Sequence, residues 1–350
     1  MKVLHISPTY FSDRSVIGGG ERYAYELASA MAKREKTVFL SFARKPYLQI
    51  ENGLVVEYLN RNFLRFVKWV DWADVVHCHQ VFALSTDFAV ALGKFLGKKV
   101  FVTDLGGGQR FAFSYHLPIL KSVDKFLLIS QYSREIWERV PLKSRARHLE
   151  VVYGGVDTSK FSPADIPKSN SILFVGRLLP HKGIDYLIEA LSDTMTLDVV
   201  GRVYDKNYLN LLKLKGKDKK VRFHHQVSDE ELLQMYRQAL ITVQPSVYRN
   251  CYGSHTAVAE LLGLSVLESM ACGTPVIVTD VASFPEIVED GVTGFIVPPN
   301  DPKAIKEKME RLIANPSLSV EMGKQAREKV VNQFGWDMVV DRCLKAYHEN

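Results

Sequence analysis

The chain has 350 residues, 47% of them hydrophobic and 24% charged, which favours two globular domains and excludes a disordered or collagenous chain. The formal net charge of +6 comes from the first half, because residues 1–165 contain 23 Lys and Arg against 16 Asp and Glu, and the remainder contains 22 against 23. Such an asymmetry indicates a binding partner that is a nucleic acid, an anionic membrane surface or an acidic substrate. No nucleic-acid-binding signature accompanies it, so the sequence predicts no nucleic-acid partner.

The cysteines and the first residues bear on the compartment. Four cysteines lie far apart without C-x-x-C spacing, and they are Cys78, Cys251, Cys272 and Cys343. This pattern argues against a disulfide framework and a structural zinc site, and favours a reducing compartment. His5 and Pro8 interrupt the first apolar run, so we expect no signal peptide. No run reaches the roughly 18 apolar residues of a membrane span, and we expect a cytoplasmic protein.

Short apolar runs alternate with stretches of helical periodicity, which is typical of βαβ units around a parallel sheet. In chain order, the first half predicts strands at 2–7, 37–42, 54–59, 74–79, 99–103, 125–130 and 150–153. The second half predicts strands at 171–175, 196–200, 221–225, 241–244, 275–279 and 294–297. A turn-rich segment separates the two series. We therefore predict an α/β fold of two doubly wound domains, residues 1–153 and 168–335, joined by a linker at 154–167.

A glycine-rich segment follows the first predicted strand. Gly18, Gly19, Gly20 and Glu21 precede a helical run, and glycines at a helix N-terminus allow an anion such as phosphate to approach the backbone. The spacing is not that of a dinucleotide fingerprint. These glycines bind a phosphate or only form a tight loop.

A basic helix with aromatic residues is predicted next. Arg61, Arg65 and Lys68 share one helical face, and the aromatic residues interleaved with them are Phe63, Phe66, Trp69 and Trp72. This pattern fits a helix on a membrane surface, and it equally fits a packed helix with a solvated basic edge.

A metal site is the next possibility, because His77, Cys78 and His79 are all ligand types. Alternation along a strand sends the two histidines to one side and Cys78 to the other, so the three residues cannot converge on one ion. We predict no metal site.

The second domain begins with a strand followed by Gly176, Arg177, Lys182 and Gly183. Arg offers a planar fork and Lys a point charge, and both can converge on one diphosphate from a strand-to-helix loop. Two solvated surface cations are the alternative. The carboxyl end of a strand is where ligands of such sheets bind, which favours the diphosphate.

Two glutamates and a short helix form the last motif. Ser265 and Glu268 fit a capping box, whereas Glu260 lies in an apolar loop where a carboxylate needs a partner. Glu260 could accept sugar hydroxyls. Backbone N–H groups that could face an anion follow it, at Leu262, Gly263, Leu264 and Ser265.

These motifs, in this order and spacing, resemble the retaining glycosyltransferases of family 4, which have the GT-B fold. The resemblance covers nearly the whole chain. It also includes Asp74 with His77 and His79, Gly155 and Asp157 with Phe161 and Pro163, Pro245 with Ser246, and Gly291 with Gly294. It implies two Rossmann-like domains facing across a cleft, the first binding the acceptor and the second the nucleotide-sugar donor. A C-terminal helix at about 336–350 would cross back to the first domain.

The resemblance also implies roles for single residues. Arg177 and Lys182 would hold the donor diphosphate, Glu260 the donor-sugar hydroxyls and Glu268 the ribose hydroxyls. Gly19 and Gly20 would approach the donor phosphate and the acceptor. No cofactor and no metal are implied, because cationic side chains and helix N-termini would stabilise the leaving diphosphate.

The sequence departs from the family pattern at two places. Asp104 stands where many members have a histidine, and it either accepts a hydrogen bond from the sugar or acceptor, as a catalytic residue would, or belongs to a glycine-rich turn. About ten extra residues within 247–259 separate Ser246 from Glu260. They shape a ligand pocket or form a surface excursion.

The sequence thus predicts a metal-independent retaining glycosyltransferase of cell-surface polysaccharide biosynthesis. Its partners would be a nucleotide-diphospho-sugar and a glycan, lipid-linked or small-molecule acceptor, with a peripheral contact at the inner membrane face. A nucleotide-sugar epimerase of the same fold and a non-catalytic nucleotide-sugar-binding protein are the alternatives.

Overall fold

A computed structural model describes residues 1–8, 19–43, 45–60, 62–81, 83–106, 119, 121–139 and 148–349. Gly18 of the glycine-rich segment and Arg61 of the basic helix lie outside the described residues. The chain divides into two compact units, one of Met1–Gly155 with Trp336–Asn350 and one of Val156–Gly335. All but the first two residues of the expected linker at 154–167 therefore belong to the second unit.

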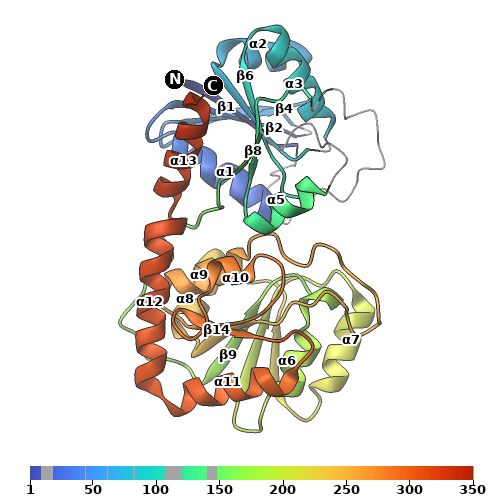
Figure 1. Ribbon diagram of the computed structural model, residues 1–350, viewed down its shortest axis with the longest axis vertical. Coiled ribbons are helices and arrows are strands. Elements are labelled where there is room, and N and C mark those ends of the chain that lie inside the picture. Colours follow the sequence, from blue (N-terminus) through green and yellow to red (C-terminus); the bar gives the residue numbers. More distant parts are fainter. Residues whose placement is uncertain are drawn as a thin grey trace. The chain divides into compact units, whose positions relative to one another are not determined.

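The first unit contains an eight-stranded sheet in the order β3-β4-β2-β1-β5-β6-β7-β8 (Figure 1). Its strands are β1 (Lys2–Ile6), β2 (Lys36–Phe42), β3 (Tyr47–Glu51), β4 (Leu54–Leu59), β5 (Val75–His79), β6 (Lys99–Thr103), β7 (Lys125–Leu128) and β8 (Leu149–Val151). All neighbouring pairs are parallel except β3 with β4. The strand order reverses between β1 and β5, which makes their carboxyl ends the switch point where ligands of such sheets bind.

Helices cover this sheet, and the last one comes from the end of the chain. They are α1 (Gly19–Met31), α2 (Phe63–Trp72), α3 (Leu84–Phe95), α5 (Gln131–Glu138) and α13 (Trp336–His348). Helix α13 packs on α1 and buries Cys343 and Tyr347 completely. The first unit is therefore completed by residues that follow the second unit in the sequence.

The second unit contains a six-stranded parallel sheet in the order β11-β10-β9-β12-β13-β14. The strands are β9 (Ser171–Val175), β10 (Thr196–Val200), β11 (Lys220–His224), β12 (Ile241–Gln244), β13 (Val276–Thr279) and β14 (Gly294–Val297). In chain order this is 3-2-1-4-5-6, the arrangement of dinucleotide-binding sheets. Its switch point lies between β9 and β12.

The helices of the second unit connect these strands in βαβ fashion. They are η3 (Pro180–Lys182), α6 (Ile184–Ala190), α7 (Lys206–Lys215), α8 (Asp229–Gln238), α9 (Leu264–Ala271), α10 (Phe284–Ile287), α11 (Pro302–Ala314) and α12 (Pro316–Phe334). The core between sheet and helices includes fully buried Phe174, Leu187 and Tyr208. No helix among the described residues is long and apolar enough to cross a bilayer.

The prediction of two α/β domains with parallel sheets is confirmed, and every predicted strand is present within two residues of its expected ends. Strand β3 was missed. It pairs antiparallel with β4 at the edge of the sheet, and it leaves Leu48 and Ile50 50% and 70% exposed. An exposed edge strand carries little of the burial pattern that identifies inner strands.

Candidate functional site

The switch point of the second unit is built from the loops that follow β9 and β12. Gly176 and Arg177 follow β9, and Pro245 and Ser246 follow β12. The two loops are in contact, since the Val247 N–H donates to the His181 carbonyl at 2.8 Å. The predicted diphosphate loop therefore lies at the position in the sheet where ligands bind.

Gly183 allows this close packing. It has a φ of +66°, and a Cβ atom there would lie 2.0 Å from the Pro245 carbonyl oxygen. Any other residue would push the two loops apart. Gly183 thus holds the turn of η3, and with it Lys182, against the segment after β12.

Lys182 and Glu260 form an ion pair at this switch point. The Lys182 Nζ donates to Glu260 Oε2 at 2.6 Å and to the Ala259 carbonyl at 3.4 Å. The side chains are only 9% and 19% exposed. Desolvating two charges is costly even when they are paired, so this pair marks a position where charge is retained at the expense of stability.

Positive charge gathers around the pair. Burial, and after it the charges of Lys182 and Arg177, lower the pKa of His181 to about 4. Arg177 is exposed, and its guanidinium lies 5.7 Å from the centre of the Tyr204 ring. His181 is therefore neutral and adds no charge, while the exposed Arg177 places a positive charge on the same loop, which suits an anion.

Helix α9 differs from the sequence prediction at its start. Its N-cap is Gly263, with a φ of +87° and no side-chain cap, so the predicted capping box of Ser265 and Glu268 is wrong. The helix begins one residue before Ser265, which is therefore helical and cannot act as N-cap. Glu268 is 8% exposed and its Oε2 accepts from the Tyr236 hydroxyl of α8 at 2.8 Å.

The start of α9 presents backbone donors. The first turn of a helix leaves its N–H groups without intrahelical acceptors, and here these belong to Leu264 and Ser265, next to the buried Leu262 and Gly263. A glycine N-cap brings no side chain over these donors.

The segment 247–259, which contains the extra residues, folds back on itself. Asn250 N–H donates to the Ser254 carbonyl, Thr256 N–H donates to the Tyr248 carbonyl, and the Tyr248 ring stacks on His255. The Tyr248 hydroxyl accepts from Ala282 N–H. One end of this insertion hairpin reaches His181 and the other reaches Lys182 through Ala259, so the segment supports the cationic loop.

In the first unit, Asp104 follows β6 and is buried. Its Oδ1 accepts from Gly106 N–H at 3.1 Å and its Oδ2 accepts from Trp137 Nε1 at 3.2 Å. A Cβ atom on Gly20 would lie 3.4 Å from the Leu105 side chain, so the start of α1 lies beside this turn. These contacts connect the Asp104 carboxylate to the turn and to Trp137 of α5.

Three buried histidines form a cluster that the sequence did not reveal. His5 of β1 joins His77 and His79 of β5, with ligand atoms within 4.8 Å of one another. His5 Nδ1 lies 2.9 Å from His79 Nε2, and the two ring nitrogens of His77 bond to Tyr347 and Thr103. Cys78 packs on the opposite side with the α2 and α3 core, as strand alternation predicts. The parallel register, which sets His5 opposite His77, is not readable from either strand alone.

The histidines are held as neutral groups. Burial lowers the pKa of His5 to about 3 and lowers the pKa values of His77 and His79 well below the usual range. Because both nitrogens of His77 are occupied by hydroxyl groups, the cluster acts as a hydrogen-bonded network between the sheet and α13.

The structure thus brings Lys182 and Glu260 into contact. It also places Arg177 close enough for its charge to lower the pKa of His181, as Lys182 does. Glu268 lies on the neighbouring helix α9 against Tyr236. Gly19, Gly20 and Asp104 belong to the first unit. The contact between Lys182 and Glu260 spans 78 residues of sequence and leaves no local pattern that could predict it.

Two family models match the chain. Residues 17–160 match the Glycosyltransferase Family 4 model, and residues 156–329 match the model of the glycosyl transferases group 1. An uncharacterized glycosyltransferase of Methanocaldococcus jannaschii is 28% identical over 295 residues, 79% of this chain and 75% of that protein. A D-inositol 3-phosphate glycosyltransferase of Streptomyces bingchenggensis is 30% identical over 226 residues, 57% of this chain and 47% of that protein.

Solved structures share the fold. Anabaena Alr3699/HepE in complex with UDP and glucose has a TM-score of 0.75 at 16% identity, covering 99% of this chain and 98% of that chain. Sucrose-phosphate synthase from Thermosynechococcus elongatus also has a TM-score of 0.75, at 20% identity, covering 100% and 99%. With two parallel-sheet units and matching models over both of them, the chain belongs to the group 1, family 4 glycosyltransferases and has the GT-B fold.

Proposed function

We propose that this glycosyltransferase takes its sugar from a nucleotide-diphospho-sugar and transfers it with retention of configuration. The observation that carries the proposal is the Lys182–Glu260 pair at the switch point of the second sheet. There, Lys182 and Arg177 supply two cations for a diphosphate, and a carboxylate lies within reach of the same ligand.

The mechanism follows from where charge develops. As the bond between sugar and phosphate breaks, negative charge grows on the leaving diphosphate, and Lys182, Arg177 and the uncapped start of α9 stabilise it. These groups neutralise the leaving diphosphate, as a divalent cation does in other transferases, so the mechanism needs no metal. The acceptor attacks on the face that the diphosphate leaves, with a donor phosphate oxygen as base.

The remaining residues follow the family roles. Glu260 holds hydroxyls of the transferred sugar, and the bond to Lys182 orients its carboxylate. Glu268 accepts from the ribose hydroxyls. Gly19 and Gly20 admit a phosphate or acceptor close to the backbone, and Asp104 positions the turn beside them.

The basic first unit binds the acceptor, which is a glycan, a lipid-linked molecule or a small molecule in the cytoplasm or at the inner membrane face. The solved Anabaena structure of the same fold is a complex with UDP and glucose, so uridine donors are the first to test.

The test is a panel of uridine, guanosine and adenosine diphosphates and their sugars, scored by thermal shift and then by product analysis. A ligand that binds only the native state raises the melting temperature. Sugar transfer to an added acceptor supports the proposal. An isomerised donor would indicate an epimerase, and binding without any product a non-catalytic protein, so either result contradicts it. Activity should also survive a chelator.

A further inference from the structure

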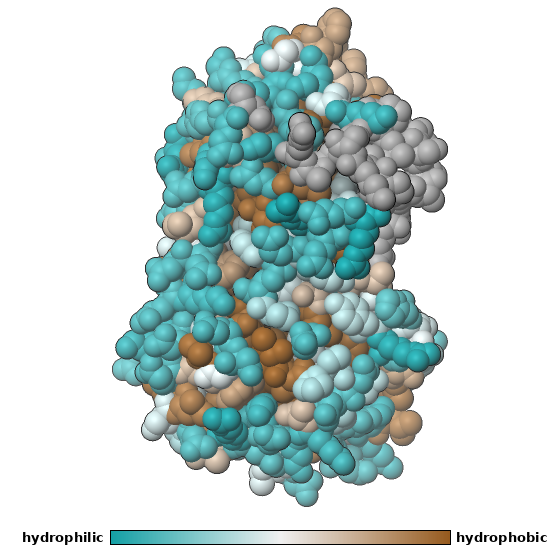
Figure 2. Space-filling view, in the orientation of Figure 1, coloured by the Kyte–Doolittle hydropathy of each residue, from teal (hydrophilic) through white to brown (hydrophobic). Residues whose placement is uncertain are grey.

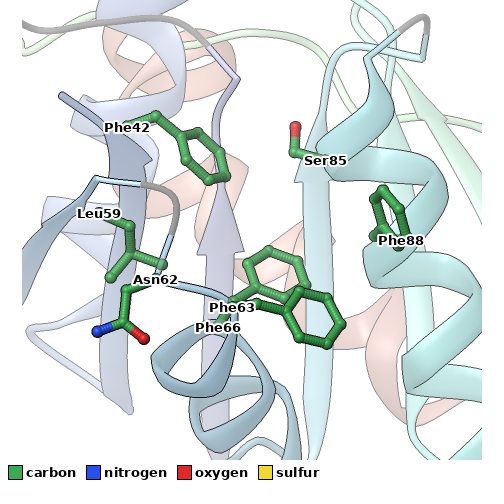
Figure 3. Close-up of a pocket in the computed structure, with 7 residues that line it drawn as sticks. All are labelled: Phe42, Leu59, Asn62, Phe63, Phe66, Ser85 and Phe88. Carbon is green, nitrogen blue, oxygen red and sulfur yellow. The ribbon is translucent and has the colours of Figure 1, made fainter. Parts of the chain in front are cut away.

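The first unit has an apolar pocket at the carboxyl ends of β2 and β4. It has a volume of about 170 Å³ and is lined mainly by Phe42, Phe63, Phe66 and Phe88, with Leu59 and Ser85 (Figure 3). An apolar cavity of about 150 Å³ holds benzene. The pocket therefore has room for about six carbon atoms of an apolar ligand.

The aromatic walls touch one another, and the mouth is open. Phe63 lies 6.1 Å from Phe88 and 6.4 Å from Phe66 between ring centres, and the α2 and α3 rings meet edge to face. Phe63 and Phe88 are 57% and 56% exposed. Ser85 Oγ is buried and has no hydrogen-bond partner among the described residues, so this wall also offers a polar atom.

An apolar stripe on α3 continues from the mouth of the pocket. Leu84, Phe88, Ala91 and Phe95 are spaced four, three and four residues apart and all are exposed, which places them on one helix face. Phe95 is 86% exposed. On the first unit, brown and pale-brown surface lies around the place where Figure 1 labels α2 (Figure 2). Contiguous exposed apolar surface of this kind marks an interaction site.

The chain around the pocket is basic. Residues 42–68 contain five Lys and Arg and two acidic residues. Both acids are engaged, Glu51 with Tyr25 and Glu57 with Trp69 and Arg65. Lys45 is exposed and follows the pocket residue Phe42 by three positions, so a positive charge close to the wall complements a phosphate.

We propose that this pocket takes the hydrocarbon chain of a lipid-phosphate acceptor, with the phosphate near Lys45. The inference rests on the proposed glycosyl transfer and specifies its acceptor class. The pocket opens at the carboxyl-end edge of the sheet, the edge where the Gly20 and Asp104 segments also lie and where ligands of such sheets bind. Because the pocket lies at this edge, the hydrocarbon chain that it binds belongs to the substrate. A helix that only adsorbs to a bilayer needs no pocket at this edge.

The first experiment titrates the full chain with decyl phosphate, below its micelle concentration, by calorimetry. Ser85→Phe fills the pocket and Phe63→Ser makes its wall polar, and each should weaken binding at least roughly tenfold. Leu214→Ser is the matched control, because Leu214 is 70% exposed on α7 of the second unit, and it should leave binding unchanged. Inorganic phosphate should bind far more weakly than decyl phosphate. Equal affinity of both pocket variants and the unsubstituted protein for decyl phosphate overturns the inference.

The second experiment follows radiolabel from a panel of nucleotide sugars into an organic extract of membrane lipids. Label should enter the organic phase, and it should be lost in Ser85→Phe while flotation with phosphatidylglycerol vesicles persists. If filling the pocket abolishes vesicle binding and label enters only water-soluble products, the pocket serves a bilayer lipid and the inference fails. Nucleoside diphosphate affinity, measured on the same variants, distinguishes this failure from failure of the proposed function.

Discussion

At the scale of single residues, the Lys182–Glu260 pair connects stability to ligand binding. A pair this shielded from solvent has already lost much of its hydration, and removing one partner leaves the other charge uncompensated. A bound diphosphate competes for the lysine, and a bound sugar competes for the glutamate. The pair therefore keeps both side chains oriented until the donor arrives.

We predict that Lys182→Met lowers both the melting temperature and the affinity for the nucleoside diphosphate. The first loss comes from an unpaired Glu260 and the second from a missing cation, so adding Glu260→Gln should restore the melting temperature and leave the affinity low. Differential scanning calorimetry and nucleotide titration on the single and double variants check this. Recovery of affinity together with stability would show that Lys182 acts only as a structural partner.

Glu268 poses a similar question, since it bonds to Tyr236. In Glu268→Gln, the amide oxygen can still accept from the tyrosine hydroxyl, but an amide cannot accept from two vicinal ribose hydroxyls at once. We predict a nucleotide affinity weaker by about 1 to 3 kcal/mol with the melting temperature nearly unchanged. Titration with the nucleotide alone is the measurement. An unchanged affinity would leave Glu268 with only the bond between α8 and α9.

At the scale of elements, the turn at Gly183 matters for nucleotide binding although glycine has no charged side chain. Gly183 connects η3 to α6, and the space next to its Cα is filled by the Pro245 carbonyl. We predict that Gly183→Ala weakens nucleotide binding as strongly as loss of Lys182, because the loop after β9 must move to relieve the clash.

The matched control is Gly253→Ala in the insertion hairpin. Gly253 has a φ of +78° with nothing within 4 Å of a Cβ atom, so it shares the backbone strain of about 1 to 2 kcal/mol without the clash. If both substitutions reduce nucleotide affinity equally, the strain and not the displaced loop is responsible.

The elements also show what a single sequence can and cannot reveal. Inner strands were predictable because both faces are buried and their apolar runs are continuous. The missed strand β3 had a signal in Asn52 and Gly53, which have φ values of 48° and 86° and form the hairpin turn into β4. The sequence shows the order in which the cationic loop, Glu260 and helix α9 with Glu268 follow one another. It does not show the contacts between them, because these depend on strand register and long-range packing.

At the scale of the first unit as a whole, its stability should depend on pH through the histidine cluster. Unfolding exposes His5, His77 and His79, whose pKa values then return toward 6.5. Below pH 6.5 the unfolded chain takes up protons that the folded cluster does not bind, down to the folded pKa of about 3 for His5. The stabilisation is therefore complete above pH 6.5 and declines as the pH falls.

We predict that His5→Gln reduces the pH dependence of the free energy of unfolding by about 1.4 kcal/mol per pH unit within that range. Urea titrations between pH 7 and about pH 4 give the slope. The control is His348→Gln, because His348 is exposed on α13, and it should keep the slope of the unsubstituted protein. Identical slopes for the two variants would contradict a role of the cluster in acid sensitivity.

The chain passes from the first unit to the second between Gly155 and Val156 and returns between Gly335 and Trp336. This has a consequence for synthesis on the ribosome. The second unit is one continuous stretch, but the first unit lacks the residue that bonds His77 until Tyr347 has been made. Domains generally fold as units during translation. The first sheet therefore stays incomplete while the 180 residues of the second unit are synthesised. During that time Phe101 and the histidine cluster of the sheet lack the cover of Tyr347. The N-terminal half is translated first and finished last, and this interval is when the nascent chain most needs protection from aggregation.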